Sequence, residues 1–283
     1  MMSLPAYILN KKVACDESLQ EVCSNVNAIV QTIMCCHAFC VVKPLLIKKM
    51  GGFMATFDIA VMAGDGIGVD VTQAALHLVD VACARIGGVQ LNRRLIEAGA
   101  RYYKDHGRDI MPGGEHIADV AHAIFVGAIG LPQIRADDGT EIAPHLRMRE
   151  RYGLYAGVRP VKAYQNIPLR LSDQRAESID FVILRESTEG LFYTAAVHGR
   201  GQEHSHEEAT ETLKITRATS LKLHDFAFKL ASKRKKRGGK GRVTCVDKAN
   251  VFQAFAFFRG IFDEVSVHYP DVVADHNYVD AQA

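Results

Sequence analysis

The chain has 283 residues, of which 48% are hydrophobic and 23% charged, and its formal net charge at pH 7 is +2. This composition excludes a wholly disordered chain and is typical of a globular protein with a substantial core. The small net charge gives no general attraction to nucleic acid or to an anionic membrane, so we expect neither as a partner. Few of the cysteines lie beyond residue 40, which favours a reduced, cytoplasmic protein, or a mitochondrial one if the source is a eukaryote.

Residues 1–53 differ in character from the rest, and we expect them to form an N-terminal extension outside the fold. The apolar run at 28–42 is short for a membrane span, and the layout of a signal peptide is missing. The cluster at 35–40 (Cys35, Cys36, His37 and Cys40) offers metal ligands, but it lacks the second ligand pair that zinc sites usually have. We therefore favour Met54 as the natural start over a metal site in this cluster.

From Met54 onward, apolar strands alternate with amphipathic helices. Phe57–Met62 is predicted to be a strand, and 71–86 a helix with apolar residues three and four apart. A second strand is predicted at Ala123–Gly127, and it leads into a glycine-containing loop at 128–132. This alternation predicts an α/β fold with mostly parallel strands, in which residues 54–153 form the first domain.

Residues 154–283 continue the alternation and are predicted to form a second α/β domain. Phe181–Leu184 is predicted to be a buried strand and 216–237 a long helix. A strand at 243–246, an apolar helix and a strand at Val265–Val267 follow. The basic run that ends the long helix complements the helix dipole, so we favour a solvated helix end over a nucleic-acid patch.

The glycines at 64, 66 and 68 suggest a dinucleotide-binding loop, but the residues around them argue against its standard form. The phosphate-binding fingerprint needs its third glycine at position 69, where Val69 stands. Asp65 and Asp70 place carboxylates where a pyrophosphate would approach the N-terminus of the helix. We therefore expect a strand–turn–helix unit without a Rossmann phosphate cradle.

Three arginines are candidates for one anion-binding pocket. Arg185 follows a predicted strand directly, and Arg149 and Arg159 lie ten residues apart across a predicted helix end and an entering strand. Ligands of open α/β sheets bind beyond the carboxyl ends of the strands, and guanidinium groups capture carboxylates bidentately. The trio therefore predicts a site for a di- or tricarboxylate. Surface pairing of Arg185 with Glu186 or Glu189 remains an open alternative.

Two further residues carry candidate chemistry. Lys248 directly follows a predicted strand, and a lysine crowded by cations in a cleft can lose its proton and act as a general base. Asp280 offers a hard oxygen ligand of the kind that suits Mg²⁺ or Mn²⁺. One carboxylate is not a metal site, so Asp280 by itself does not predict one.

Five segments resemble, in order, the isocitrate and isopropylmalate dehydrogenase family of metal-dependent decarboxylating dehydrogenases, which includes tartrate dehydrogenase. They are GDGIG at 64–68, LRMRERYGLYAGVRP at 146–160, LRESTEGLF at 184–192, VDKANV at 246–251 and YPDVVADHNYVDA at 269–281. The resemblance implies a two-domain fold like that of isopropylmalate dehydrogenase. It also implies oxidation of a malate-type 2-hydroxy acid by NAD or NADP, followed by loss of CO₂ through a metal-stabilised enolate.

The resemblance also implies roles for individual residues. The substrate carboxylates would be held by the three arginines, Arg149, Arg159 and Arg185. Lys248 would take part in proton transfer, and Asp280 would be one of the ligands of Mg²⁺ or Mn²⁺. In the family these last two residues would reach the partner subunit's site, which implies a homodimer.

On the nicotinamide side, the resemblance points to Gly130 and Thr140. The family commonly has a tyrosine seven residues after Arg185, where it transfers a proton to the enolate; here Phe192 occupies that position and Tyr193 follows. Either Tyr193 serves as the catalytic proton donor, or decarboxylation is impaired, because a phenyl ring cannot donate a proton.

The family also continues past its YVDA segment with further metal-binding aspartates and an adenosine-binding segment. We therefore expect a C-terminally incomplete member with weak or no turnover. A non-catalytic subunit that dimerises with a full-length relative and regulates it is the alternative from another functional class. A reading frame cut short is the third possibility.

Overall fold

The computed structural model describes residues 39–42, 55–164, 166–168, 171–194 and 203–282. By its internal contacts the chain divides into two compact units, Met1–Gly130 and Leu131–Ala283. The sequence placed the boundary after residue 153, whereas the structure assigns residues 131–153 to the second unit.

Among the described residues, the first unit contains a sheet with the strand order β1-β4-β2-β3. Strand β2 runs parallel to both β3 and β4, while β1 pairs antiparallel with β4. The bounds are β1 Phe39–Val42, β2 Ala55–Gly64, β3 Val89–Leu95 and β4 Ala123–Ala128. Strand β1 belongs to the stretch 1–53 that we expected outside the fold, so four residues of that stretch join the sheet.

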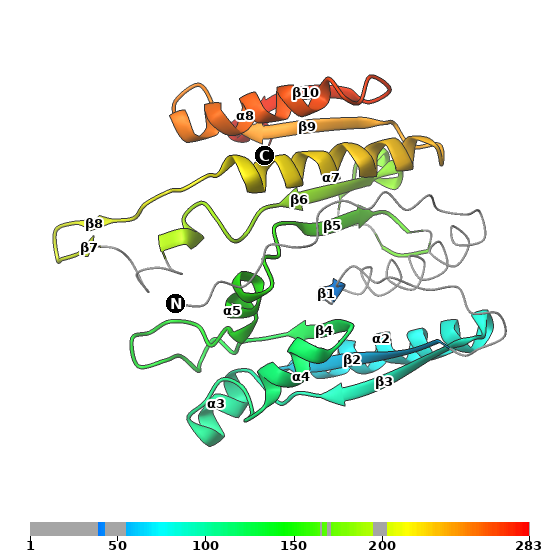
Figure 1. Cartoon of the computed structure of the whole chain (residues 1–283), viewed down its shortest axis with the longest axis vertical. Coiled ribbons are helices and arrows are strands. Elements are labelled where there is room, and N and C mark those ends of the chain that lie inside the picture. Colours follow the sequence, from blue (N-terminus) through cyan, green and yellow to red (C-terminus); the bar gives the residue numbers. More distant parts are fainter. Residues whose placement is uncertain (1–38, 43–54, 165, 169–170, 195–202, 283) are drawn as a thin grey trace, which may run out of the picture. The chain divides into compact units, whose positions relative to one another are not determined.

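The helices of the first unit are α2 (Ile67–Ile86), α3 (Ala100–His106) and α4 (Gly114–Val120), as far as the structure describes it (Figure 1). Ala75 and Val79 of α2 are buried together with Val61 of β2 and Phe125 of β4. Because these helical residues are four apart, they form one apolar face toward the sheet. The predicted strands at 57–62 and 123–127 and the helix at 71–86 are confirmed.

Helix α2 is long and apolar enough to cross a membrane by length and composition. Core helices of α/β proteins meet the same two criteria, so this is weak evidence for a membrane span. The buried residues of α2 follow one another at spacings of three and four and include Thr72, Ala75 and Val79. That spacing is typical of a helix that covers one face of a sheet.

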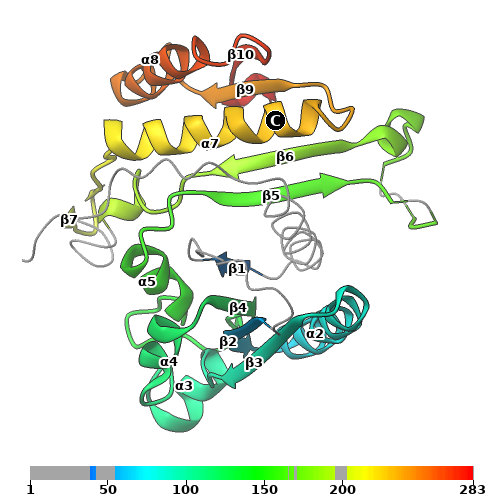
Figure 2. The same cartoon turned by 45° about the vertical axis from the view of Figure 1, so that its right-hand side comes forward.

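Among its described residues, the second unit contains three strand pairs, β5 with β6 and β7 with β8 antiparallel, and β9 with β10 parallel. In Figures 1 and 2, helix α7 lies between β6 and β9. The strand bounds are β5 Gly157–Lys162, β6 Asp180–Arg185, β7 Glu203–His204, β8 Ala209–Thr210, β9 Arg242–Asp247 and β10 Val273–Tyr278. The helices are α5 Pro144–Arg151, α7 Arg217–Lys235, α8 Gln253–Ser266 and α9 Val279–Gln282, with a 3₁₀ turn at Gln174–Ser178.

The core of the second unit forms where α7, α8 and β9 meet. Phe228 of α7, Ile261 and Phe262 of α8 and Cys245 of β9 are all buried there. The predicted strand at Val265–Val267 is wrong, because α8 continues to Ser266. Val265 is buried in the same cluster, one helical turn after Ile261. Burial at this spacing is the pattern of a helix, whereas a strand would bury every second residue.

The strand predicted at Phe181–Leu184 is present as β6, but the prediction that it is buried is wrong. Phe181 and Ile183 are each 48% exposed. They lie two residues apart and therefore share one face of the strand. Strand β6 belongs to a two-stranded ladder with β5, and this face of the ladder is only partly covered by the described residues.

Candidate active site

Strands β5 and β6 place two of the predicted arginines on one face of their ladder. In the antiparallel register, Arg159 lies opposite Ile183, and Gly157 lies opposite Arg185. Opposite residues of an antiparallel pair share a face, as does every second residue along a strand. Arg159 and Arg185 are therefore diagonal neighbours, and the position directly opposite Arg185 carries no side chain.

Helix α5 brings Arg149 to the same cluster. Burial lowers the pKa of Arg149, and the charges of Arg185 and Arg159 lower it further. The pKa of Arg185 is lowered by burial and by the charge of Arg159. Three guanidinium groups that disfavour one another's charge would be stabilised by an anion bound among them. The structure thus brings the trio together, and its role in binding carboxylates remains a prediction.

The alternative of a surface ion pair for Arg185 does not match the hydrogen bonds of the neighbouring acids. Glu186 accepts hydrogen bonds from the backbone N–H groups two and three residues further on, at 2.6 and 2.8 Å. Glu189 accepts from the N–H and the hydroxyl of Thr216, at 2.8 and 2.5 Å. The Arg185 Nε donates to the Ser187 Oγ at 3.1 Å. Glu186 acts on Arg185 through its charge, which raises the pKa of the arginine and partly offsets the lowering.

His145, to which the sequence assigned no role, lies one helical turn before Arg149 on α5. Burial and the charge of Arg149 lower the pKa of His145 to about 4, so its imidazole is neutral at pH 7. Its Nδ1 is buried without a hydrogen-bond partner among the described residues. The spacing of four residues between His145 and Arg149 is the sequence signal that could have identified it.

Lys248 and Asp280 meet at the ends of the parallel strands β9 and β10. The Lys248 Nζ lies 2.5 Å from the Asp280 Oδ1, and the side chains are 27% and 62% exposed. The hydrogen bond from Lys248 is the main cause that lowers the pKa of Asp280. The general-base interpretation of Lys248 required crowding by cations. The structure instead pairs this lysine with a carboxylate.

Asp280 does not form a metal centre with other described residues. No group of three or more His, Cys, Asp or Glu residues in the described ranges is placed to hold a metal ion. Mg²⁺ prefers near-ideal octahedral coordination by oxygen. The described residues therefore do not form a Mg²⁺ or Mn²⁺ site. Of the ligands that such a site needs, they supply only the carboxylate of Asp280. The side chains of the cluster at 35–40 lie outside the described residues.

Asp65 in the glycine loop ties three backbone segments together. Its carboxylate accepts hydrogen bonds from the N–H groups of Ala100, Arg101 and Gly130, each at 2.8 Å. Asp65 is 3% exposed, whereas the N-cap of α2 is Gly66, which has no side chain. The carboxylate therefore serves the start of α3 and the loop after β4, and not the helix that it precedes.

The glycine loop packs directly onto the end of β4. A Cβ at Gly64 would lie 2.1 Å from the Ala128 carbonyl oxygen, and one at Gly68 would lie 2.4 Å from the same atom. Gly64 also has a φ of 76°, which disfavours other residues. These glycines therefore permit close packing of α2 against β4. The loop is a strand–turn–helix unit, as expected, and this packing explains the glycines at 64 and 68.

The two residues predicted on the nicotinamide side have their donors engaged within the chain. The Gly130 N–H donates to Asp65 at 2.8 Å. The hydroxyl and the N–H of Thr140 both donate to the Asp138 Oδ1, at 2.6 and 2.9 Å. These two residues therefore do not present a built dinucleotide site, and their contact with a cofactor remains a prediction.

Tyr193 lies beside a cation in a fixed segment. The Lys214 Nζ is 4.3 Å from the centre of the Tyr193 ring. Gly190 and Lys214 exchange backbone hydrogen bonds of 2.7 and 3.2 Å. One residue after Tyr193, the buried Thr194 hydroxyl accepts from the Thr212 N–H at 2.8 Å and donates to its carbonyl oxygen at 2.9 Å. The tyrosine is thus held in place, while its neighbour Phe192 is 39% exposed.

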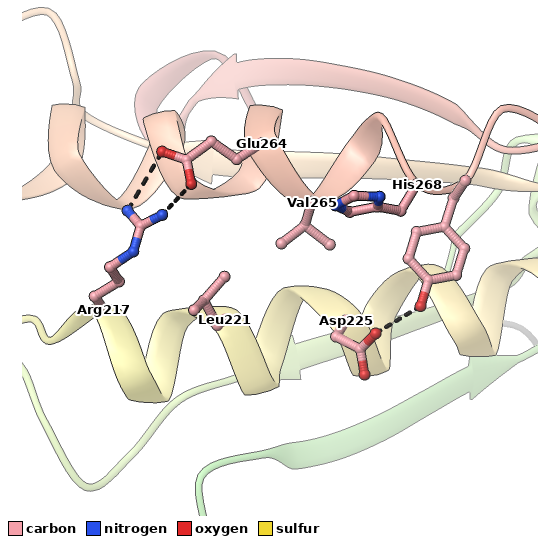
Figure 3. Close-up of a pocket in the computed structure, with 7 residues that line it drawn as sticks. Arg217, Leu221, Asp225, Glu264, Val265 and His268 are labelled. Carbon is pink, nitrogen blue, oxygen red and sulfur yellow. Dashed lines mark hydrogen bonds and ion pairs between the residues drawn. The ribbon is translucent and has the colours of Figure 1, made fainter. Parts of the chain in front are cut away.

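A groove of about 410 Å³ between α7 and α8 contains none of the predicted site residues. Figure 3 shows Arg217 and Glu264 paired across it. The Tyr269 hydroxyl donates to the Asp225 Oδ1 at 2.6 Å. Its main charged groups are therefore compensated within the groove. This arrangement favours a structural contact between the two helices over a ligand site.

Comparisons with known proteins agree on one family. The family model for isocitrate/isopropylmalate dehydrogenase matches residues 58–283. The chain is 31% identical over 231 residues to a 3-isopropylmalate dehydrogenase of Escherichia coli strain K12, a match that covers 79% of this chain and 61% of the relative. The chain thus spans about three fifths of the length of the curated relatives that it matches.

Solved structures support the same fold. An isocitrate dehydrogenase from Methylococcus capsulatus matches with a TM-score of 0.62 and 25% identity, over 80% of this chain and 61% of that one. A β-decarboxylating dehydrogenase from Thermococcus kodakarensis matches with a TM-score of 0.56 and 27% identity, over 80% and 59% of the two chains. With the extent of the family match and the shared fold, the chain belongs to the isocitrate/isopropylmalate dehydrogenase family.

Proposed function

We propose that this chain serves the NAD- or NADP-dependent oxidative decarboxylation of a malate-type 2-hydroxy acid of the 3-isopropylmalate, isocitrate or tartrate/malate class. Family membership supports the reaction type. The observation that carries the substrate class is the convergence of Arg149, Arg159 and Arg185, whose charges disfavour one another until an anion binds. Three guanidinium groups suit a substrate with at least two carboxylates.

In this proposal the chain's own residues bind the substrate and move protons. The reaction removes a hydride from C2 and the proton of its hydroxyl; the carboxylate on C3 then leaves as CO₂, and C3 takes up one proton. The arginines hold the carboxylates. Lys248, as the free amine, is the candidate for taking the proton of the C2 hydroxyl, and Tyr193, which lies beside Lys214, is the candidate for giving a proton to C3, because an amine can accept a proton and a phenol can donate one.

We propose NAD or NADP and Mg²⁺ or Mn²⁺ as cofactors on the strength of family membership. The described residues build neither cofactor site, and Phe192 occupies the position at which the family commonly has a tyrosine. We therefore propose that the 283-residue chain has weak or no turnover by itself. We further propose that it acts as a cytoplasmic homodimer in which Lys248 and Asp280 serve the partner subunit's site.

The first experiment measures turnover and binding on the purified chain. Isopropylmalate, isocitrate, malate and tartrate are each assayed with Mn²⁺ and with NAD⁺ or NADP⁺, and the same acids are titrated calorimetrically. We expect reduced cofactor at or near background, but measurable binding of at least one acid. Robust reduction would overturn the proposal of weak turnover, and a chain that binds none of the acids would contradict the substrate class.

A matched pair of variants tests the arginine trio. Arg185→Gln should weaken binding of the acid about 10- to 100-fold, because a hydrogen bond to a charged group contributes about 1.5–3 kcal/mol. Arg175→Gln is the control, because the Arg175 side chain is 90% exposed and pairs with Asp173, two residues before it. Equal effects of the two substitutions would show that binding depends on general positive charge.

Phe192 favours a second candidate function, a non-catalytic subunit that dimerises with a full-length relative and regulates it. A phenyl ring at that position cannot donate the proton that decarboxylation requires. Co-expression with a full-length family member from the same organism tests this candidate. Co-purification and a changed rate of the active subunit would support it, whereas separate elution of the two chains would exclude it.

A further inference from the structure

Asp247, the last residue of β9, is a buried carboxylate directly before Lys248. Its side chain is fully buried. It accepts hydrogen bonds from the Arg259 Nε at 2.9 Å, the Arg259 Nη2 at 2.6 Å and the Ala249 N–H at 2.8 Å. Burial opposes ionisation of this carboxyl, but the hydrogen bonds outweigh it, and the pKa of Asp247 lies below its ordinary value. The end of β9 is thus anchored to α8 by a bidentate ion pair.

Arg259 also contacts the end of β10. Its guanidinium carbon lies 5.1 Å from the centre of the Tyr278 ring, within the range of a cation–π interaction. Tyr278 is the register partner of Asp247 in the parallel ladder, and it lies two residues before Asp280. One guanidinium group thus contacts the last residue of each strand, just before the chain reaches Lys248 on one side and Asp280 on the other.

The Lys248–Asp280 contact needs such an anchor. The Asp280 side chain is 62% exposed, and exposed ion pairs contribute only about 0–1 kcal/mol because holding two long side chains costs entropy. A contact of 2.5 Å between their charged atoms is therefore expected to persist only where the backbone at both positions is already fixed.

We propose that Arg259 is a positioning residue that sets the relative placement of Lys248 and Asp280 through Asp247 and Tyr278. The inference rests on the proposed function only in assigning Lys248 and Asp280 to the active site. The guanidinium fork is required because a lysine at position 259 would offer a point charge that cannot pair bidentately with Asp247.

A second arginine on the same two strands provides a matched control. Arg242, at the start of β9, pairs with Asp275 of β10 at 2.9 Å, with side chains 58% and 36% exposed. It joins the same strands but lies at the end of β9 away from Lys248. Loss of this pair should therefore loosen the strand pair in general without a specific effect on Lys248.

The experiment follows the side-chain ammonium of Lys248 by ¹H–¹⁵N NMR of the full chain. The Lys248→Met variant identifies the resonance, and Asp280→Asn shows how it changes when the ion pair is lost. We expect Arg259→Lys and Arg259→Met to shift or remove the resonance as Asp280→Asn does. Arg242→Met should leave it in place. A wild-type Lys248 resonance in a folded Arg259→Met chain would overturn the proposal.

Tyr278→Leu decides the question if both Arg259 variants fail to fold. It leaves the Asp247–Arg259 pair intact and removes the contact with β10, so we expect the Lys248 resonance to move toward its position in Asp280→Asn. An unchanged resonance in Tyr278→Leu would contradict the role of Arg259 at the end of β10 and so overturn the proposal.

Turnover gives a second readout if the chain is active by itself or in a complex with a full-length relative. Displacement of a reacting group by about 1 Å can cost on the order of a hundredfold in rate, so Arg259→Lys should lower kcat about 10- to 100-fold. KM for the hydroxy acid should stay unchanged, because the arginine trio binds it. Absence of turnover in the wild type leaves the NMR result standing, so failure of the proposed function and failure of the positioning role are distinguishable.

Discussion

Burial lowers the pKa of Arg149 on α5, and the positive charge of Arg185, at the end of β6, lowers it further. The two residues are distant in sequence, and Arg159 on β5 adds a third charge to the cluster. Like charges that act on one another favour an anion that compensates them. The cluster is therefore a candidate site for an anionic ligand.

This repulsion should make the ligand-free chain respond to salt. Screening weakens the repulsion, so we expect salt to raise the free energy of unfolding of the wild type more than that of Arg149→Met, by about 0.5–1 kcal/mol. Urea unfolding at low and high salt concentration measures the difference. Arg175→Gln should respond to salt as the wild type does, and an equal response of all three chains would contradict repulsion within the cluster.

His224 should make stability depend on pH. Burial lowers its pKa to about 4, and its Nε2 lies 3.2 Å from the Phe258 carbonyl oxygen. Because the folded-state pKa lies below the unfolded value of about 6.5, protonation favours the unfolded chain. The contribution of His224 is therefore complete above about pH 6.5 and is lost as pH falls toward about 4, by up to about 1.4 kcal/mol per pH unit.

Urea unfolding between about pH 7 and about pH 5 measures how the free energy of unfolding depends on pH. His224→Gln should reduce this slope by the contribution of one proton. The pH dependence that remains in His224→Gln should come from His145, whose pKa is also lowered to about 4. His77→Gln, at an exposed position on α2, is the control and should leave the slope unchanged. A His224→Gln chain with the full wild-type slope would contradict the assignment.

Asp65 should be essential to the stability of the first unit. Asp65→Asn replaces one acceptor oxygen by an NH₂ donor, which would face backbone N–H groups of Ala100, Arg101 or Gly130 in a buried place. We expect a loss of about 2–4 kcal/mol in the free energy of unfolding. Asp70→Asn, in the exposed first turn of α2, should change it by no more than about 0.5 kcal/mol. Similar midpoints of urea unfolding for the two variants would refute this role of Asp65.

Tyr193, and not Phe192, should supply the proton for decarboxylation. Tyr193→Phe should lower the steady-state rate at which the protonated keto acid forms by on the order of a hundredfold or more, which is the usual contribution of a positioned general acid. Phe192→Leu should have little effect, because the phenyl ring has no proton to give. The measurement is the rate of keto-acid formation, by the chain itself or in its complex with a full-length relative. Equal rates in the two variants would exclude Tyr193 from this step.

The sequence by itself determined the three longest of the described helices, α2, α7 and α8, the strands β2, β4, β6 and β9, and the family. The apolar residues of α2 and α7 recur at helical spacing, and this local pattern carries the prediction without knowledge of any partner. The five matching segments placed the chain in its family before any geometry was known. The wrong strand at Val265–Val267 shows the limit of local patterns, because three residues cannot distinguish a short strand from the last turn of a helix.

The tertiary structure alone decided burial and the geometry of the site. The exposure of β6 depends on what covers its face, and the electrostatic coupling of Arg149 to Arg159 and Arg185 depends on where the fold places α5 relative to β5 and β6. The Asp247–Arg259 pair likewise joins a strand end to a later helix. In each case the energy comes from partners distant in sequence, and charge repulsion, desolvation and ion pairing act over distances that only the folded chain defines.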